Sequence, residues 1–93
     1  MPHGIDFDWD DENKQHLAAH KTTPAEFEQV LNNNPLDLDY ELVDNKERYR
    51  SVGLTRGGRL LTVVWTVRHG KVRAVTAFPA SVSDTKAFME RSR

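Results

Sequence analysis

The sequence predicts an α+β fold: a short N-terminal strand and two helices packed on a four-stranded antiparallel meander sheet, followed by a C-terminal helix. Two observations carry this prediction. Helix-start signals occur only near the two ends of the chain, whereas the middle holds four β-prone runs separated by turn sequences. These turns are Asp44-Asn45, Arg56-Gly57-Gly58 and His69-Gly70. Short turns between successive β-prone runs are typical of antiparallel hairpins. The 93 residues form one domain, 1–93, with no room for a second core.

The N-terminal strand and the first helix are predicted from residues 5–21. Apolar side chains alternate with aspartates over residues 5–10, the pattern of a short half-buried strand. The acidic residues 10–12 then favour a helix start, where they oppose the positive end of the helix dipole. We expect this helix to cover residues 11–21. One face carries residues spaced i, i+3, i+4 and i+7: Asn13, His16, Leu17 and His20.

The second helix has the clearest start in the chain. Thr23 is a capping residue, Pro24 occupies the first turn, and Glu26 follows three residues after the cap. Its apolar stripe consists of Phe27, Val30 and Leu31, and the helix ends at Asn32-Asn33-Asn34-Pro35.

The predicted strands cover residues 36–42, 48–54, 59–68 and 71–78. In the first of them leucines and a tyrosine alternate with acids, and the third is the most β-prone run in the chain. Ser81 or Ser83 caps a last helix that passes through Phe88 and Met89 and ends at residues 91–93.

Composition excludes several classes of protein. No apolar run approaches the ~18 residues that span a bilayer, and the N-terminus lacks the pattern of a signal peptide, so we expect a cytoplasmic protein. The absence of Cys rules out disulfides and thiolate zinc sites.

The two halves of the chain carry opposite charge. The net charge is −1, but the charges of residues 1–45 sum to −9 and those of residues 46–93 to +8. Such asymmetry indicates a charged partner without identifying it.

His16 and His20 have the i, i+4 spacing of a helical zinc-binding pair. The residues between them are Leu-Ala-Ala, so the catalytic Glu of a zincin motif is absent. Two other interpretations stay open: polar contacts between helix and sheet, or a proton shuttle near neutral pH.

Basic residues on the strands are candidates for phosphate binding. Arg48 and Arg50 share one face of a strand and Arg73 lies on the last strand, so their guanidinium groups can converge if neighbouring strands pair in order. The alternative is a solvated face whose arginines pair with acids of the first half. Among the large aromatic residues, Trp9 and Trp65 are expected in the core and Tyr49 to be the more exposed.

The ordered motifs of the chain resemble those of BrnT-type toxins. No single piece is specific, but their order and spacing cover nearly the whole chain, roughly residues 5–88. The first-half pieces are Phe7-Asp8-Trp9-Asp10, Asn13, His16, His20, Thr23-Pro24-Ala25-Glu26 and Asn34-Pro35. The second-half pieces are Glu47-Arg48-Tyr49-Arg50, Gly53, the run from Gly58 to Thr66, and the run from Val72 to Ala77.

The resemblance implies a RelE-like fold and the toxin of a type II toxin–antitoxin module. It implies a metal-independent endoribonuclease, with no cofactor, that cleaves RNA to a cyclic phosphate and so inhibits translation. The implied partners are RNA and a cognate antitoxin with a ribbon-helix-helix DNA-binding domain that neutralises the toxin. A homodimer and a toxin–antitoxin heterotetramer are both compatible with it.

Carried onto this chain, the family pattern implies four catalytic residues. His20 is the expected acid or base, Arg48 and Arg73 the phosphate ligands, and Glu47 a second base or an orienter of Arg48. Lys14, Arg50 and Arg59 are the expected contacts to the RNA backbone.

One position departs from the pattern: Phe78 stands where many members carry an arginine. A catalytically inactive module that binds protein or nucleic acid is therefore the alternative function. A small metalloenzyme using His16 and His20 is a third.

Overall fold

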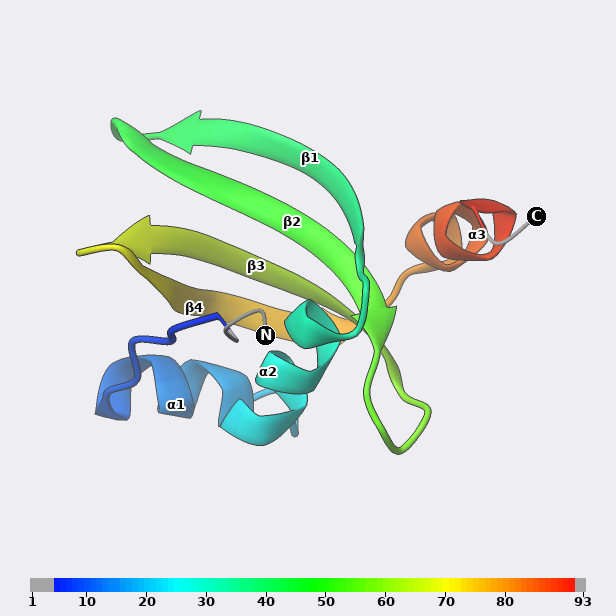
Figure 1. The fold of residues 1–93 in the computed structure, drawn as a ribbon, viewed down its shortest axis with the longest axis horizontal. Coiled ribbons are helices and arrows are strands. Elements are labelled where there is room, and N and C mark those ends of the chain that lie inside the picture. The colour runs from blue at the N-terminus through cyan, green and yellow to red at the C-terminus, as the bar shows by residue number, and fades with distance from the viewer. Residues whose placement is uncertain (1–4, 92–93) are drawn as a thin grey trace.

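The structure is a computed structural model that describes residues 5–91, and it confirms the predicted α+β architecture (Figure 1). Two helices precede a four-stranded sheet and one follows it. In chain order the elements are α1 (Asp11–Ala18), α2 (Pro24–Asn32), β1 (Leu36–Val43), β2 (Lys46–Leu54), β3 (Leu60–Arg68), β4 (Lys71–Pro79) and α3 (Val82–Arg91).

The strands form an antiparallel sheet in the order β1-β2-β3-β4, the predicted meander. Its first and last turns require left-handed backbone. Asp44 and Asn45 have φ of 50° and 63°, and His69 and Gly70 have φ of 55° and 75°. Two successive residues with positive φ are what a tight hairpin between right-twisted strands requires, and Asn, Asp and Gly tolerate this conformation best.

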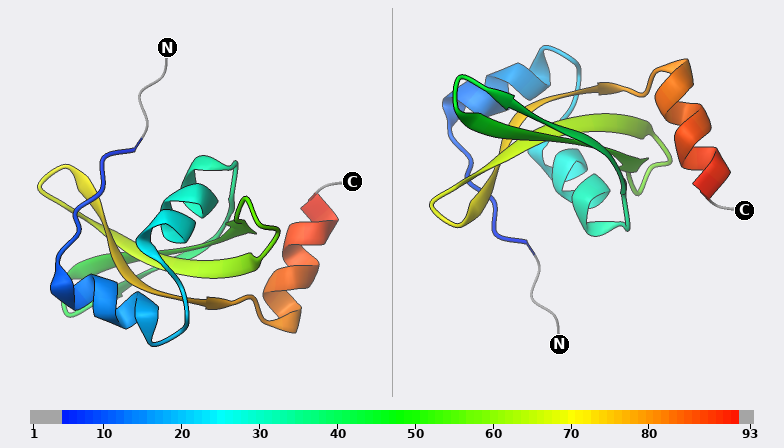
Figure 2. Two further views of the ribbon diagram at one scale, coloured as in Figure 1. Left: turned by 90° about the horizontal axis from the view of Figure 1, so that it is seen from below. Right: turned by 90° about the horizontal axis from the view of Figure 1, so that it is seen from above.

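The helices cover opposite faces of the sheet. In β3, Leu61 and Val63 pack into the core with α1 and α2, whereas Thr62 between them donates a hydrogen bond to Asp84 of α3. Since successive strand residues face opposite sides, α3 lies on the other face. Figure 1 shows α1 alongside β4, and Figure 2 shows α3 standing apart from α1 and α2.

The core lies between the sheet and the first two helices. Its fully buried members include Leu17, Phe27 and Val63, and Trp9 and Trp65 pack half-buried against them, as expected. Close packing of α2 on β2 depends on Gly53, because a Cβ there would come within 3.2 Å of a Val30 methyl group.

Tyr49 is less exposed than expected from sequence. It is half-buried and stacks on Trp65, with ring centroids 4.5 Å apart, because the two residues are paired across β2 and β3. The exposed tyrosine is Tyr40 on the edge strand β1.

The predicted N-terminal strand and first helix are both shorter than expected. The strand reduces to one parallel bridge between Phe7 and Val72. Helix α1 ends at Ala18 rather than at residue 21. The Thr22 N–H donates to the Leu17 carbonyl and the Lys21 N–H to the Ala18 carbonyl, a pattern that closes helices around a left-handed residue. That residue is Lys21, with φ of 55°.

At the other end of the chain, Ser81 rather than Ser83 caps α3, because its hydroxyl accepts a hydrogen bond from the Asp84 N–H. The predicted helix end at residues 92–93 lies outside the described residues. None of the helices described in residues 5–91 is long and apolar enough to cross a membrane.

Candidate active site

A cleft of about 520 Å³ opens where α1 meets the ends of β2, β3 and β4 next to the β1–β2 and β3–β4 turns. It is the place where candidate residues from both halves of the chain come together. It is lined by Glu12, Asn13, His16, Asn45, Lys46, Glu47, Arg48, Thr66, Val67, Arg68, Arg73, Ala74 and Val75.

Arg48 and Arg73 line this cleft from β2 and β4. Thr66 lies between them: it pairs with Arg73, and its hydroxyl donates to the Glu47 carbonyl at 2.6 Å. Of the three arginines expected to converge, Arg48 and Arg73 therefore line one cleft, whereas Arg50 does not. Within residues 5–91, the half-buried Arg48 makes no ion pair, so its guanidinium is available to an anion.

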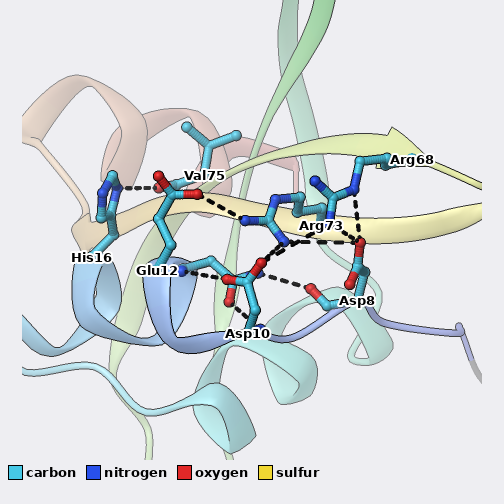
Figure 3. Close-up of polar contacts among 8 residues, drawn as sticks. Asp8, Asp10, Glu12, His16, Arg68, Arg73 and Val75 are labelled. Carbon is cyan, nitrogen blue, oxygen red and sulfur yellow. Dashed lines mark hydrogen bonds and ion pairs between the residues drawn. The ribbon is translucent and has the colours of Figure 1, made fainter.

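Arg73 is enclosed by three carboxylates from the N-terminal segment, and its side chain is only 11% exposed (Figure 3). Its guanidinium lies 2.7 Å from Asp10, 3.2 Å from Glu12 and 3.8 Å from Asp8. Nη1, the atom nearest Asp10, is buried and makes no well-aligned hydrogen bond, so that contact is an ion pair.

The ion pair shifts the titration of both partners. Contact with the Arg73 guanidinium lowers the pKa of Asp10 to about 2, with help from the Asn13 N–H that Asp10 caps. Asp10 in turn raises the pKa of Arg73. Asp8 also binds Arg68 of β3 at 2.9 Å. The opening acidic motif therefore folds onto the basic end of the sheet.

His16 presents an exposed imidazole to the cleft from α1. Its Nδ1 lies 3.3 Å from the Val75 carbonyl oxygen, as Figure 3 shows. A carbonyl accepts only from a protonated nitrogen, so this contact favours the proton on Nδ1 and leaves Nε2 for a substrate.

His20 does not line the cleft. It lies in the turn after α1, and its ring packs edge-on against Phe78 with centroids 6.3 Å apart. Since α1 ends at Ala18, His16 and His20 do not share a helix face as predicted. Within residues 5–91, no three His, Asp or Glu side chains are grouped to hold a metal ion.

Glu47 lines the cleft, but its carboxylate is engaged elsewhere. It accepts hydrogen bonds from the Tyr40 and Tyr49 hydroxyls at 3.2 and 3.3 Å. Desolvation and the Glu47 charge raise the pKa of both tyrosines. Adjacent residues of a strand face opposite sides, so Glu47 and Arg48 point apart.

The three residues expected to contact the RNA backbone lie outside the cleft. Arg50 binds Asp39 at 3.0 Å and Asp84 at 3.4 Å. Arg59 binds Glu26 and the Lys21 carbonyl at the far end of the sheet. Lys14 is exposed on α1. Phe78, which replaces the arginine of the family pattern, is also outside the cleft lining.

Among the cleft residues that sequence reasoning missed are Glu12 and Thr66. Glu12 precedes His16 by one helical turn, a spacing that puts both on one side of α1 and that the sequence does contain. Thr66 carried no such signal, since its place depends on strand register.

A comparison with protein families shows which family the chain belongs to. The model described as "Ribonuclease toxin, BrnT, of type II toxin–antitoxin system" matches residues 9–84, which include every candidate residue of the cleft. No curated protein matches the chain. The match covers most of the sequence and contains α1, α2 and the whole sheet, so the chain belongs to the BrnT family of ribonuclease toxins of type II toxin–antitoxin systems.

Proposed function

We propose that this chain is an endoribonuclease toxin that cleaves RNA without a metal ion in the cleft between α1 and the sheet. The observation that carries the proposal is the meeting of Arg48, Arg73 and His16 in one cleft. Two guanidinium groups suit a phosphodiester, and an imidazole suits proton transfer near neutral pH. Membership of the BrnT family gives RNA as the substrate class.

The proposed reaction is an internal transesterification. The 2′-oxygen of a ribose attacks the adjacent phosphorus, its proton passes to a base, and the bond from phosphorus to the 5′-oxygen breaks. An acid protonates the departing 5′-oxygen, which leaves a 2′,3′-cyclic phosphate on one product and a 5′-hydroxyl on the other.

Arg48 and Arg73 would stabilise the charge that builds on the phosphate oxygens in the transition state. His16 would transfer a proton through Nε2 while Nδ1 stays bound to the Val75 carbonyl. The family pattern suggested His20 for this role. Its position outside the cleft, against Phe78, favours His16.

The proposal includes neutralisation by a cognate antitoxin with a ribbon-helix-helix DNA-binding domain. An antitoxin is the partner that a type II toxin family implies. The fold would be RelE-like, and the assembly a homodimer or a toxin–antitoxin heterotetramer.

The experiment compares cleavage of a fluorescent single-stranded RNA by wild type, His16→Ala, His20→Ala and Arg48→Ala in the presence of EDTA. We expect His16→Ala and Arg48→Ala to lose roughly 10²-fold or more in kcat/KM. His20→Ala should stay within about threefold of wild type, since a surface change away from the site costs little. Arg56→Ala, an exposed arginine at the β2–β3 turn, is the matched control for lost positive charge.

Two outcomes would contradict the proposal. If His20→Ala loses activity and His16→Ala keeps it, the catalytic histidine is His20. If wild type binds RNA without cleaving it, the chain is an inactive binding module. That second function is favoured by one observation, the three carboxylates that surround Arg73.

A further inference from the structure

Transesterification of RNA needs two proton-transfer groups, and His16 supplies one. The other residues of the cleft with titratable side chains below pH 11 are Glu12, Lys46 and Glu47. The Glu47 carboxylate already accepts from two tyrosines, and a protonated Lys46 has no lone pair with which to take a proton. Glu12 remains as an acceptor.

We infer that Glu12 is the general base of the cleft and that His16 is the general acid, an assignment that rests on the proposed ribonuclease function. The two residues are four apart on α1, so they lie one above the other on the same side of the helix. Figure 3 shows both side chains beside β4, with Arg73 next to Glu12.

Glu12 differs from the other two carboxylates at Arg73. Asp8 and Asp10 do not line the cleft, whereas Glu12 does, and its side chain is 75% exposed. Asp10 is fixed as the cap of α1, and Asp8 is fixed by Arg68. Among the residues that the structure describes, Glu12 contacts only Arg73, at 3.2 Å. Glu12 is therefore the carboxylate that can move to a substrate while Arg73 keeps its partner Asp10.

The contact with Arg73 also places Glu12 where a base is needed. A phosphate that binds Arg73 takes the position at Nη2 that Glu12 occupies, and so brings the adjacent ribose 2′-hydroxyl next to the released carboxylate. The charged groups around Glu12 are Arg73 of β4, with Arg68 of β3 beyond Asp8, Asp10 at the start of α1, and His16 one turn later.

The step balances without a co-reactant. Glu12 takes the 2′-hydroxyl proton as the 2′-oxygen bonds to phosphorus. His16, protonated on both nitrogens, gives its Nε2 proton to the 5′-oxygen as the bond from phosphorus to that oxygen breaks. The cyclic phosphate keeps one negative charge, and proton exchange with water resets both residues.

The test measures the pH dependence of kcat with wild type, Glu12→Gln, Glu12→Asp and Asp11→Asn. We expect Glu12→Gln to lose at least about 10²-fold in kcat with a KM no higher than that of wild type, and to lose the fall in rate at low pH. Glu12→Asp should retain part of the activity and that fall. Asp11→Asn removes the same charge from the first turn of α1 outside the cleft and should behave as wild type.

A second substrate separates the two roles. In an RNA with sulfur in place of the bridging 5′-oxygen, the leaving thiolate needs no acid because thiol pKa values lie near 8.5. This substrate should restore cleavage by His16→Ala to within about tenfold of wild type and leave Glu12→Gln impaired, since general acid catalysis accounts for about 10²-fold or more.

The outcomes distinguish this inference from the proposed function. If wild type cleaves RNA and Glu12→Gln matches its kcat and pH profile, the base assignment is wrong and the ribonuclease function stands. Rescue of Glu12→Gln by the sulfur substrate would reverse the two roles. If wild type cleaves no RNA, both the function and the catalytic role of Glu12 are rejected.

Discussion

At the scale of single residues, the candidate site depends on the Arg73 guanidinium, which contacts three carboxylates. Arg73 lies on β4, yet the carboxylates that surround it come from the segment just before α1 and from its first turn. Asp10 has a double role, because it also caps α1 by accepting from the Asn13 N–H. The helix that carries His16 is therefore fixed to the strand that carries Arg73.

This double role predicts a dependence of stability on pH. Contact with Arg73 lowers the pKa of Asp10 in the folded state from its ordinary value of 3.8 to about 2. The ionised carboxylate therefore contributes stability that is present above pH 3.8 and is lost as pH falls toward 2. Asp10→Asn keeps a good capping side chain but removes the charge. We expect its unfolding free energy, measured by urea titration from pH 6 to pH 2.5, to fall less steeply than that of wild type below pH 4.

The matched control for this prediction is Asp11→Asn, which removes an exposed carboxylate one residue away. Its profile should follow that of wild type. An Asp10→Asn profile parallel to wild type across the acid range would mean that the Arg73 ion pair contributes no stability in solution.

At the scale of elements, α3 is held to the sheet by a buried carboxylate rather than by an apolar stripe. Asp84, in the first turn of α3, accepts from the Thr62 hydroxyl at 2.7 Å and from Arg50 at 3.4 Å. Thr62 is fully buried, so its hydroxyl depends on Asp84 as its hydrogen-bond acceptor. Arg50, expected from sequence to contact RNA, instead links β1, β2 and α3 through Asp39 and Asp84.

Removal of this carboxylate should loosen α3. We expect Asp84→Ala to lower the free energy of unfolding by about 2–3 kcal/mol, because it leaves the buried Thr62 hydroxyl without an acceptor and removes one of the two carboxylates that bind Arg50. Asp84→Asn, which retains an oxygen acceptor for Thr62, should cost roughly half as much. The measurement is urea unfolding, and Glu90→Ala on the exposed side of α3 should stay within about 0.5 kcal/mol of wild type. A similar loss in Glu90→Ala would show that helix propensity, not the buried carboxylate, holds α3.

At the scale of the whole molecule, the fold brings the acidic first half and the basic second half into contact. Acids of residues 1–45 pair with Arg50, Arg59, Arg68 and Arg73. Four of the eleven basic residues of the second half are therefore paired internally, and a net charge of −1 says little about the cleft. The cations left to meet RNA there are Arg48 and Lys46, with Arg73 once Glu12 has moved.

This charge distribution predicts a weak dependence of RNA binding on salt. Two or three phosphate contacts on a single strand give a slope of log K against log salt concentration between about −1.4 and −2.1. Fluorescence anisotropy with an uncleavable 2′-O-methyl RNA measures it, and Arg48→Ala should make the slope shallower by about 0.7. A slope steeper than about −4 would mean that arginines now paired with acids are released on binding, or that the binding surface extends beyond the cleft.

The sequence by itself determined the features that depend on neighbouring residues. Local hydrogen bonds determine the start of α2 at the Thr23 cap. Local backbone dihedrals determine the turns at Asp44-Asn45 and His69-Gly70, and these turns in sequence produce the meander. The family motifs also predicted that Arg48 and Arg73 act together as phosphate ligands. The predicted meander explains why both line one cleft, since their strands lie in the same sheet.

The tertiary structure alone decided which side chains face the cleft. His16 lies in it and His20 does not, because Lys21 adopts a left-handed conformation that ends α1 early, at a residue type that gives no such signal. Glu47 turns to two tyrosines of the opposite face, and Arg73 meets carboxylates about 60 residues away in sequence. Side-chain direction and long-range ion pairs depend on register and packing, which no local pattern encodes.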